Sequence, residues 1–160
     1  MITSSGHMRL PAQQVATLFV SASVAEHAAL NRIFSRSNWK LHSAYTSHEA
    51  LAILGRDIIP VVICQQDLPD GNWKLLLERT KALPAAPRFI VSTRDVNEHL
   101  WGDVLQRGGY DLLAMPWDSR EVLKVIALAW RSWEFASRSL RHPPLPALSA
   151  KTMSFIAAVA

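Results

Sequence analysis

The amino-acid sequence predicts an α/β domain in which a parallel β-sheet is covered by helices on both faces. Short apolar segments alternate with longer segments of helical periodicity over residues 15–140. The segment Val61–Gln65 is apolar at its first four positions and then stops at polar residues, as a strand buried on both faces does. With no internal repeat, the 160 residues fit one domain of this class.

In the first part of the chain, each helix follows a strand, and two helices begin at a capping box. Ser23 with Glu26 starts the first helix, and Thr46 with Glu49 starts the second. We expect Gly55 to end the second helix, because glycine is favoured just beyond a helix C-terminus. The elements predicted here are the strand Ala16–Val20, the helix 24–36, the strand Lys40–Ala44, a helix between Thr46 and Gly55, the strand Val61–Gln65 and the helix 73–82.

The last part of the chain contains two more strand–helix pairs. Asp95 and Glu98 mark the start of one helix, and Asp118 with Glu121 caps the other. Five strands and five helices in strict alternation predict a flavodoxin-like, doubly wound (βα)5 sandwich, whose five-stranded parallel sheet has the order 2-1-3-4-5. The elements predicted here are the strand 88–92, the helix 96–107, the strand Asp111–Ala114 and the helix 119–140.

Composition and charge describe a cytoplasmic globular protein. The formal charge of +4 is only mildly basic and does not indicate nucleic-acid binding. The lone cysteine, Cys64, cannot form an internal disulfide and is predicted to be a buried core residue. No apolar run approaches the ~18 residues of a membrane span. The six histidines lack metal-ligand spacing, so we expect them in solvent.

Several motifs give the sequence a family resemblance over residues 15–133. The third strand leads into Leu-Pro-Asp-Gly at 68–71, a Gly-Gly pair precedes the fifth strand, Ser92 ends the fourth, and Met115-Pro116 follows the fifth. This pattern resembles the receiver domains of response regulators, the CheY-like family. The resemblance implies a cis peptide bond before Pro116. Composition separates the rest of the chain: we interpret residues 1–8 as an expression scar and residues 141–160 as a Pro-rich linker with a short apolar tail, on either side of a receiver-like domain with an extended last helix at 15–140.

The positions at which the family performs phosphotransfer hold other residues in this sequence. The family's acceptor aspartate corresponds to Gln65, and an amide has no anionic oxygen that could form an acyl phosphate. Its Mg²⁺-binding acidic pair corresponds to Ser21 and Ala22, which are poor ligands for a hard cation. Its lysine before the proline corresponds to Met115, whereas its hydroxyl after the fourth strand is retained as Ser92.

We therefore predict a non-phosphorylatable receiver-like module that acts through protein–protein interaction in two-component, phosphorelay-type signal transduction. We expect no enzymatic activity, no cofactor and no metal. One alternative is a phosphorylatable receiver with Asp67 as a displaced acceptor, whereas Asp70 is interpreted as a turn former that binds nearby backbone amides. The other alternative is a nucleic-acid-binding regulator that uses the basic face of the last helix. That face carries Arg120, Lys124, Arg131 and Arg138.

The resemblance implies that a protein partner or a second copy binds through the fourth helix, the fifth strand and the fifth helix. We expect no membrane partner. The last helix, about 33 Å long at 1.5 Å per residue, is longer than such a sheet requires. Its distal tryptophans either contact another surface or fold back on the chain ends. The candidate interface anchors are Trp101, Tyr110, Trp117, Trp130 and Trp133.

Overall fold

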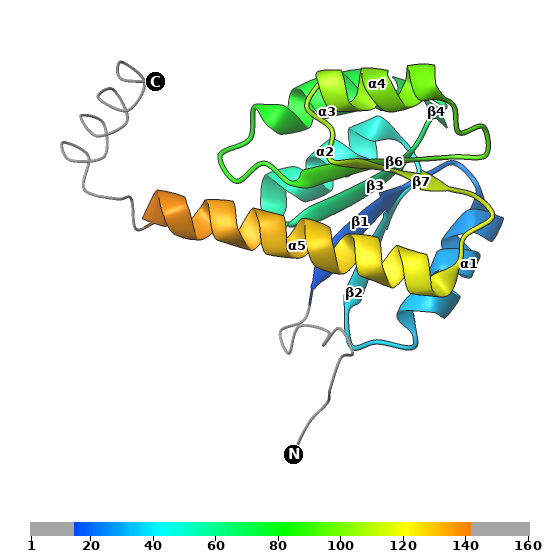
Figure 1. The fold of residues 1–160 in the computed structure, drawn as a ribbon, viewed down its shortest axis with the longest axis horizontal. Coiled ribbons are helices and arrows are strands. Elements are labelled where there is room, and N and C mark those ends of the chain that lie inside the picture. The colour runs from blue at the N-terminus through cyan, green and yellow to red at the C-terminus, as the bar shows by residue number, and fades with distance from the viewer. Residues whose placement is uncertain (1–14, 142–160) are drawn as a thin grey trace, which may run out of the picture.

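The structure is a computed structural model that describes residues 15–141, and its main sheet has the predicted topology (Figure 1). Five parallel strands lie in the order β2-β1-β3-β6-β7, which is the predicted order 2-1-3-4-5 once the two strands of a short hairpin are set aside. The five strands are β1 (Ala16–Val20), β2 (Lys40–Ala44), β3 (Val61–Gln65), β6 (Arg88–Thr93) and β7 (Asp111–Ala114).

Five helices cover the two faces of this sheet. α1 and α5 pack on one face, and α2, α3 and α4 pack on the other, so each face has its own hydrophobic cluster. In Figure 1, α5 crosses in front of the sheet. Their bounds are α1 (Val24–Phe34), α2 (Ser47–Arg56), α3 (Trp73–Lys81), α4 (Glu98–Gln106) and α5 (Ser119–Arg141).

β3 is buried on both faces, as its unbroken apolar sequence predicts. Val62 and Cys64 pack in the cluster with α2, α3 and α4, whereas Val61 and Ile63 pack in the cluster with α1 and α5. This alternation is the two-residue period of a strand. Burial raises the pKa of the Cys64 thiol, so this side chain is a core residue and not a nucleophile.

The predicted helix starts at Ser23, Thr46 and Asp118 are confirmed. Each side chain accepts a hydrogen bond from the backbone N–H three residues later, at 3.0–3.2 Å. The predicted start of α4 is wrong by two residues. Asn97, whose backbone is extended, is the cap, and its Oδ1 accepts from the N–H of Leu100 at 2.8 Å.

The predicted end of α2 at Gly55 is also wrong. α2 continues through Gly55 to Arg56, and the N–H of Asp57 donates to the carbonyl of Ile53. Gly55 does not have the positive φ that would require glycine at a helix end. The residue therefore behaves as an ordinary helical position.

A short antiparallel hairpin, β4 (Asp67–Leu68) with β5 (Gly71–Asn72), follows β3 and was not predicted. Asp70 lies in its turn and binds backbone amides, as the sequence predicts. Its carboxylate accepts from the backbone N–H groups of Ser47 and His48 at 2.9 and 3.1 Å, which belong to α2. The hairpin is therefore attached to the N-terminus of α2, where the helix dipole favours a negative charge.

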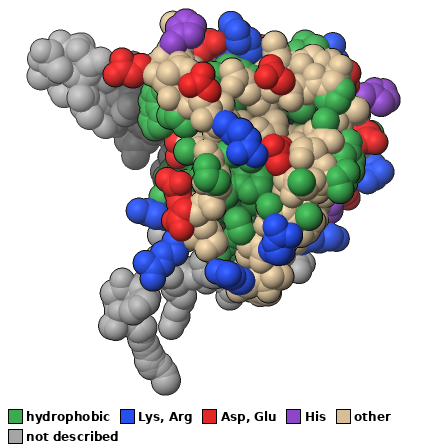
Figure 2. Space-filling view, turned by 90° about the vertical axis from the view of Figure 1, so that its right-hand side faces the viewer, with side chains coloured by type: hydrophobic (Ala, Val, Ile, Leu, Met, Phe, Trp, Pro, Cys, Tyr) green, Lys and Arg blue, Asp and Glu red, His purple; other side chains and the backbone are tan. Residues whose placement is uncertain are grey.

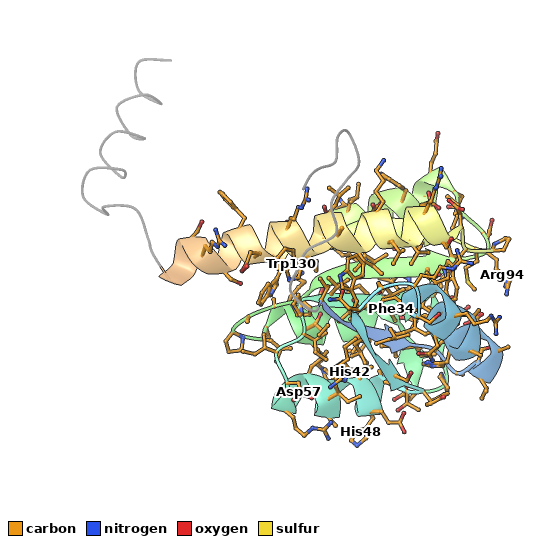
Figure 3. All side chains as sticks on the ribbon, turned by 90° about the horizontal axis from the view of Figure 1, so that it is seen from below. Phe34, His42, His48, Asp57, Arg94 and Trp130 are labelled. Atoms are coloured by element: carbon orange, nitrogen blue, oxygen red, sulfur yellow. The ribbon has the colours of Figure 1, made fainter. Side chains whose placement is uncertain are left out.

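The distal half of α5 packs on its own domain. Trp130 lies beneath α5, against the cluster with α1 (Figure 3), and the indole N–H of Trp133 lies 3.5 Å from the carbonyl of Ala85. The Arg88 guanidinium donates to the hydroxyl and the carbonyl of Ser132. These contacts join the distal half of α5 to β6 and to the loop before it. The chain ends that the sequence suggested as another surface lie outside the described residues.

Some predictions lie outside the described residues, namely the expression scar at 1–8 and the Pro-rich linker and apolar tail after α5. Within residues 15–141, no helix is both long and apolar enough to cross a membrane.

Candidate functional site

The carboxyl ends of β1, β3 and β6 surround an open cavity of about 400 Å³. Parallel strands present their carboxyl ends at one edge of the sheet, where ligand sites of doubly wound domains form. Figure 2 views the molecule from this side and shows hydrophobic side chains with charged side chains of both signs around them. The lining comes from Ser21, Ala22 and Ser23 after β1, Glu26 in α1, Gln65, Gln66 and Asp67 around the end of β3, and Thr93, Arg94 and Asp95 around the end of β6.

Glu26 directs its carboxylate toward this cavity. The hydroxyl of Ser21 donates to Glu26 Oε1 at 2.6 Å and accepts from the backbone N–H of Ser23 at 3.0 Å. Glu26 Oε2 lies 3.9 Å from the Arg94 guanidinium, which is largely exposed at the outer end of the loop after β6 (Figure 3). The Ser21 hydroxyl therefore both donates and accepts a hydrogen bond, and the Glu26 carboxylate contacts this hydroxyl and the Arg94 guanidinium.

Gln65 is half-buried, and its amide Nε2 lies 3.0 Å from the sulfur of Met115. The neighbouring Gln66 directs its Oε1 to the hydroxyl of Thr93, which donates to it at 2.9 Å. Two neutral amides thus occupy the centre of this sheet edge. The Gln66 amide contacts Thr93 of β6, and the Gln65 amide contacts Met115 directly after β7. Neither amide provides an anionic nucleophile.

Solved structures of receiver domains match this chain closely over most of its length. A signal receiver domain of an HD domain-containing protein from Pseudomonas fluorescens has a TM-score of 0.72 and 23% identity, and the match covers 82% of this chain and 97% of that chain. A signal receiver domain of a putative Luxo repressor protein from Vibrio parahaemolyticus has a TM-score of 0.73 and 17% identity, and the match covers 78% of this chain and 96% of that chain. The chain has the receiver-domain fold.

A CheY-like receiver domain protein from Methanospirillum hungatei is similar to the same extent, with a TM-score of 0.69, 21% identity, and coverage of 78% of this chain and 99% of that chain. No protein-family model and no curated protein sequence matches the chain. At these identities the similarity establishes the fold, and the chemistry must be deduced from the residues at the sheet edge.

Ser92, the hydroxyl that the receiver resemblance singled out, is fully buried behind this sheet edge. Its Oγ accepts a hydrogen bond from the indole N–H of Trp117 at 3.0 Å. The Trp117 ring also packs edge-on against Phe19, with centroids 5.4 Å apart. The peptide bond between Met115 and Pro116 is cis, the isomer that the resemblance implies.

His27 contradicts the expectation that the histidines lie in solvent, because only 3% of its surface is exposed. Its Nε2 lies 2.9 Å from the carbonyl of Ser21, and its Nδ1 lies 3.0 Å from the hydroxyl of Ser43. The ring also contacts Phe19 and Tyr45, with centroid distances of 4.8 and 4.3 Å. His27 thus fixes the backbone of the loop after β1 through its contact with the Ser21 carbonyl.

The residues at this edge do not fit the Mg²⁺ ion that the receiver resemblance implies. After β1 they supply a hydroxyl, which is already bonded to Glu26, and the methyl group of Ala22. Magnesium requires hard anionic oxygens in nearly octahedral geometry. Among the described residues, no group of three or more acidic, histidine or cysteine side chains is placed to hold a metal ion.

Sequence reasoning found Ser21, Ala22, Gln65 and Asp67 in the cavity wall but missed Glu26 and Arg94. The signal for Arg94 was its position directly after a buried strand. Glu26 was interpreted only as part of a capping box, because the sequence does not show that its side chain turns away from the helix end.

The five aromatic interface candidates differ in exposure. Trp101 on α4 is 45% exposed, beside a groove that it lines with Val96. The other four candidates are half-buried. Tyr110, Trp117 and Trp130 pack against the cluster formed with α1 and α5. Trp101 is therefore the candidate that presents the most surface to a partner.

Proposed function

We propose that this chain is a receiver-fold signalling module that acts by binding other proteins and is not switched by phosphorylation. Its setting would be two-component, phosphorelay-type signalling in the cytoplasm. The observation that carries the proposal is the state of residue 65. The position that corresponds to the acceptor aspartate holds an amide, and this amide contacts Met115 at the position that corresponds to the charge-neutralising lysine.

The chemistry of phosphotransfer supports this proposal. The reaction needs a carboxylate oxygen to attack phosphorus, and a positive environment to stabilise the transferred phosphoryl group. Gln65 and Met115 are uncharged, and the hydroxyl of Ser92 is engaged by Trp117. Two charged side chains of the cavity wall pair with each other: Glu26 Oε2 lies 3.9 Å from the Arg94 guanidinium.

A protein-binding role is supported by the exposed apolar side chains around α4. Val96, Trp101 and Leu105 are each between 44% and 49% exposed. Tryptophan is a frequent anchor at protein interfaces, and exposed apolar side chains close together usually mark contact surfaces. We therefore place the partner-binding surface at α4 and its neighbours.

The absence of phosphorylation can be tested by intact-mass measurement. We expect no added phosphoryl group after incubation of the full chain with acetyl phosphate and Mg²⁺. The physical reason is that the amide at residue 65 cannot displace acetate from phosphorus. The matched control is Asp67→Asn, which removes the exposed hairpin carboxylate that lines the cavity.

One result would overturn the proposal. A stoichiometric addition that is stable in acid, labile in base and lost in Asp67→Asn would identify Asp67 as a displaced acceptor. The domain would then be a working phosphorylation switch.

A further inference from the structure

The outward face of α5 combines apolar anchors with a row of cations. Leu128 is 39% exposed and Phe135 is 74% exposed, whereas Val122, Ile126 and Ala129 of the same helix are fully buried. Residues seven positions apart lie on nearly the same line of a helix, about 10.5 Å from each other. Leu128 and Phe135 therefore form an apolar line that points away from the domain.

Basic side chains lie beside this line. Lys124, Arg131 and Arg138 repeat at the same seven-residue spacing and are exposed, as is Arg120 one turn before them. The exposed carboxylate on this side of the helix is Glu121, and Glu134 is largely covered and lies 3.9 Å from Arg138. Between Arg120 and Arg138 the face thus carries four cations against two carboxylates and is net positive.

We propose that this face of α5 binds an acidic amphipathic helix of a partner protein. A helix that repeats apolar residues every seven positions would place them against Leu128 and Phe135, as in a coiled-coil seam. Carboxylates beside that apolar line would face Lys124, Arg131 and Arg138. This inference deepens the proposed function and rests on its protein-binding role, because it names the kind of partner that the fifth helix would bind. It does not depend on the chemistry of Gln65.

Charge favours this occupant over other parts of the same protein. A second α5 laid along the first would bring two rows of cations together, and like charges in contact disfavour association. The chain ends do not complement the face either, because residues 1–14 and 142–160 contain no Asp or Glu. Nucleic acid would use the cations but would leave Phe135 without a contact.

A synthetic peptide provides the probe. We would use a fluorescent helical peptide of about three heptads, with leucine on the seam and glutamate beside it, and a second peptide with glutamine in place of every glutamate. Fluorescence anisotropy with the full chain should show the acidic peptide binding at least about tenfold more tightly than the neutral one. Added salt should weaken the acidic peptide's binding, because exposed charges are screened.

Variants of α5 locate the binding. Phe135→Ser, and separately Lys124→Glu combined with Arg131→Glu, should each lower the affinity by about tenfold or more. Matched controls are Ile58→Ser, an apolar side chain 70% exposed elsewhere, and Arg32→Glu combined with Arg79→Glu. These controls should leave the affinity within about twofold. Circular dichroism checks that every variant is folded.

Several results would overturn the inference. They are no binding of the acidic peptide, equal binding of the neutral peptide, or equal losses in the α5 variants and the matched controls. Self-association of the chain that is lost in Phe135→Ser would show that a second copy occupies the face. Binding of a duplex DNA that depends on Lys124 and Arg131 but not on Phe135 would assign the cations to nucleic acid.

Discussion

The hydroxyl of Ser92 is buried at the edge of the sheet and receives its hydrogen bond from the indole of Trp117. The same indole packs against Phe19 of β1, so one side chain satisfies a buried polar group and fills part of the core. A buried hydroxyl that loses its partner pays the cost of desolvation without compensation. Trp117 is therefore a structural residue in the first place, although the sequence suggested it as an interface anchor.

Replacing Trp117 tests this role at the level of one hydrogen bond. Trp117→Phe keeps an aromatic ring against Phe19 but removes the N–H that reaches Ser92. We expect the free energy of unfolding to fall by about 1–2 kcal/mol, measured by urea denaturation. The matched control is Trp101→Phe at an exposed position, which should change stability by less than about 0.5 kcal/mol. Equal effects of the two variants would contradict the structural role of this hydrogen bond.

At the scale of elements, Asp70 connects the β4–β5 hairpin to α2. Its carboxylate accepts from two backbone N–H groups of the first turn of the helix. The bond from the N–H of Ser47 is the main cause that lowers the pKa of Asp70 below its ordinary value. The hairpin and the start of α2 should therefore be held together more firmly when this carboxylate is ionised.

The pH dependence of this connection follows from the direction of the pKa shift. Because the pKa of Asp70 is lower in the folded chain than in the unfolded chain, its contribution to stability is present above the unfolded value of about 3.9. It is lost as the pH falls through the folded value. We expect Asp70→Asn to be less stable than the wild type at neutral pH, with a difference that shrinks at acidic pH.

Thermal unfolding of the wild type and Asp70→Asn across a pH series measures this difference. Asp67→Asn, on the same hairpin, is the matched control and should run parallel to the wild type. A constant difference between the wild type and Asp70→Asn, from neutral pH to below pH 3, would show that the ionised carboxylate does not stabilise the fold.

At the scale of the whole molecule, the receiver fold is complete, and the positions that the resemblance assigns to the acceptor and the cation hold the uncharged side chains of Gln65 and Met115. The five strands pair in the doubly wound order, and the carboxyl ends of β1, β3 and β6 surround a cavity of about 400 Å³. The cavity wall is formed by loops, strand ends and the first turn of α1, and none of its residues belongs to the two hydrophobic clusters. This separation between scaffold and chemistry can be tested by restoring the chemistry.

The variant Gln65→Asp with Ala22→Asp and Met115→Lys should be labelled by acetyl phosphate in the presence of Mg²⁺. The new carboxylate at residue 65 would attack phosphorus with loss of acetate, and the other two changes supply an acidic side chain after β1 and a cation after β7. Intact mass is the readout, and the matched control carries Ala22→Asp and Met115→Lys with Gln65 retained. A folded triple variant that stays unlabelled would show that the cavity itself no longer suits the reaction.

The five strands of the main sheet and their order could be predicted from the sequence, because strands that alternate with helices build a doubly wound parallel sheet. Val61–Gln65 and the caps at Ser23, Thr46 and Asp118 are examples, since each depends on residues close together in the chain. Residue type alone also excluded an acyl phosphate at Gln65. The β4–β5 hairpin could not be predicted.

Contacts between distant segments could not be predicted in this way, because no local pattern encodes them. Asp70 resembles an ordinary turn residue until the fold places α2 beside it, and His27 resembles a surface residue until β2 and the β1 loop enclose it. Trp130 and Trp133 had two possible surroundings in the sequence, and only the packing of α5 brings Trp130 against the cluster with α1 and the Trp133 indole beside the carbonyl of Ala85. Side-chain direction and burial are properties of the assembled layers, so they were decided only when the sheet and its helices came together.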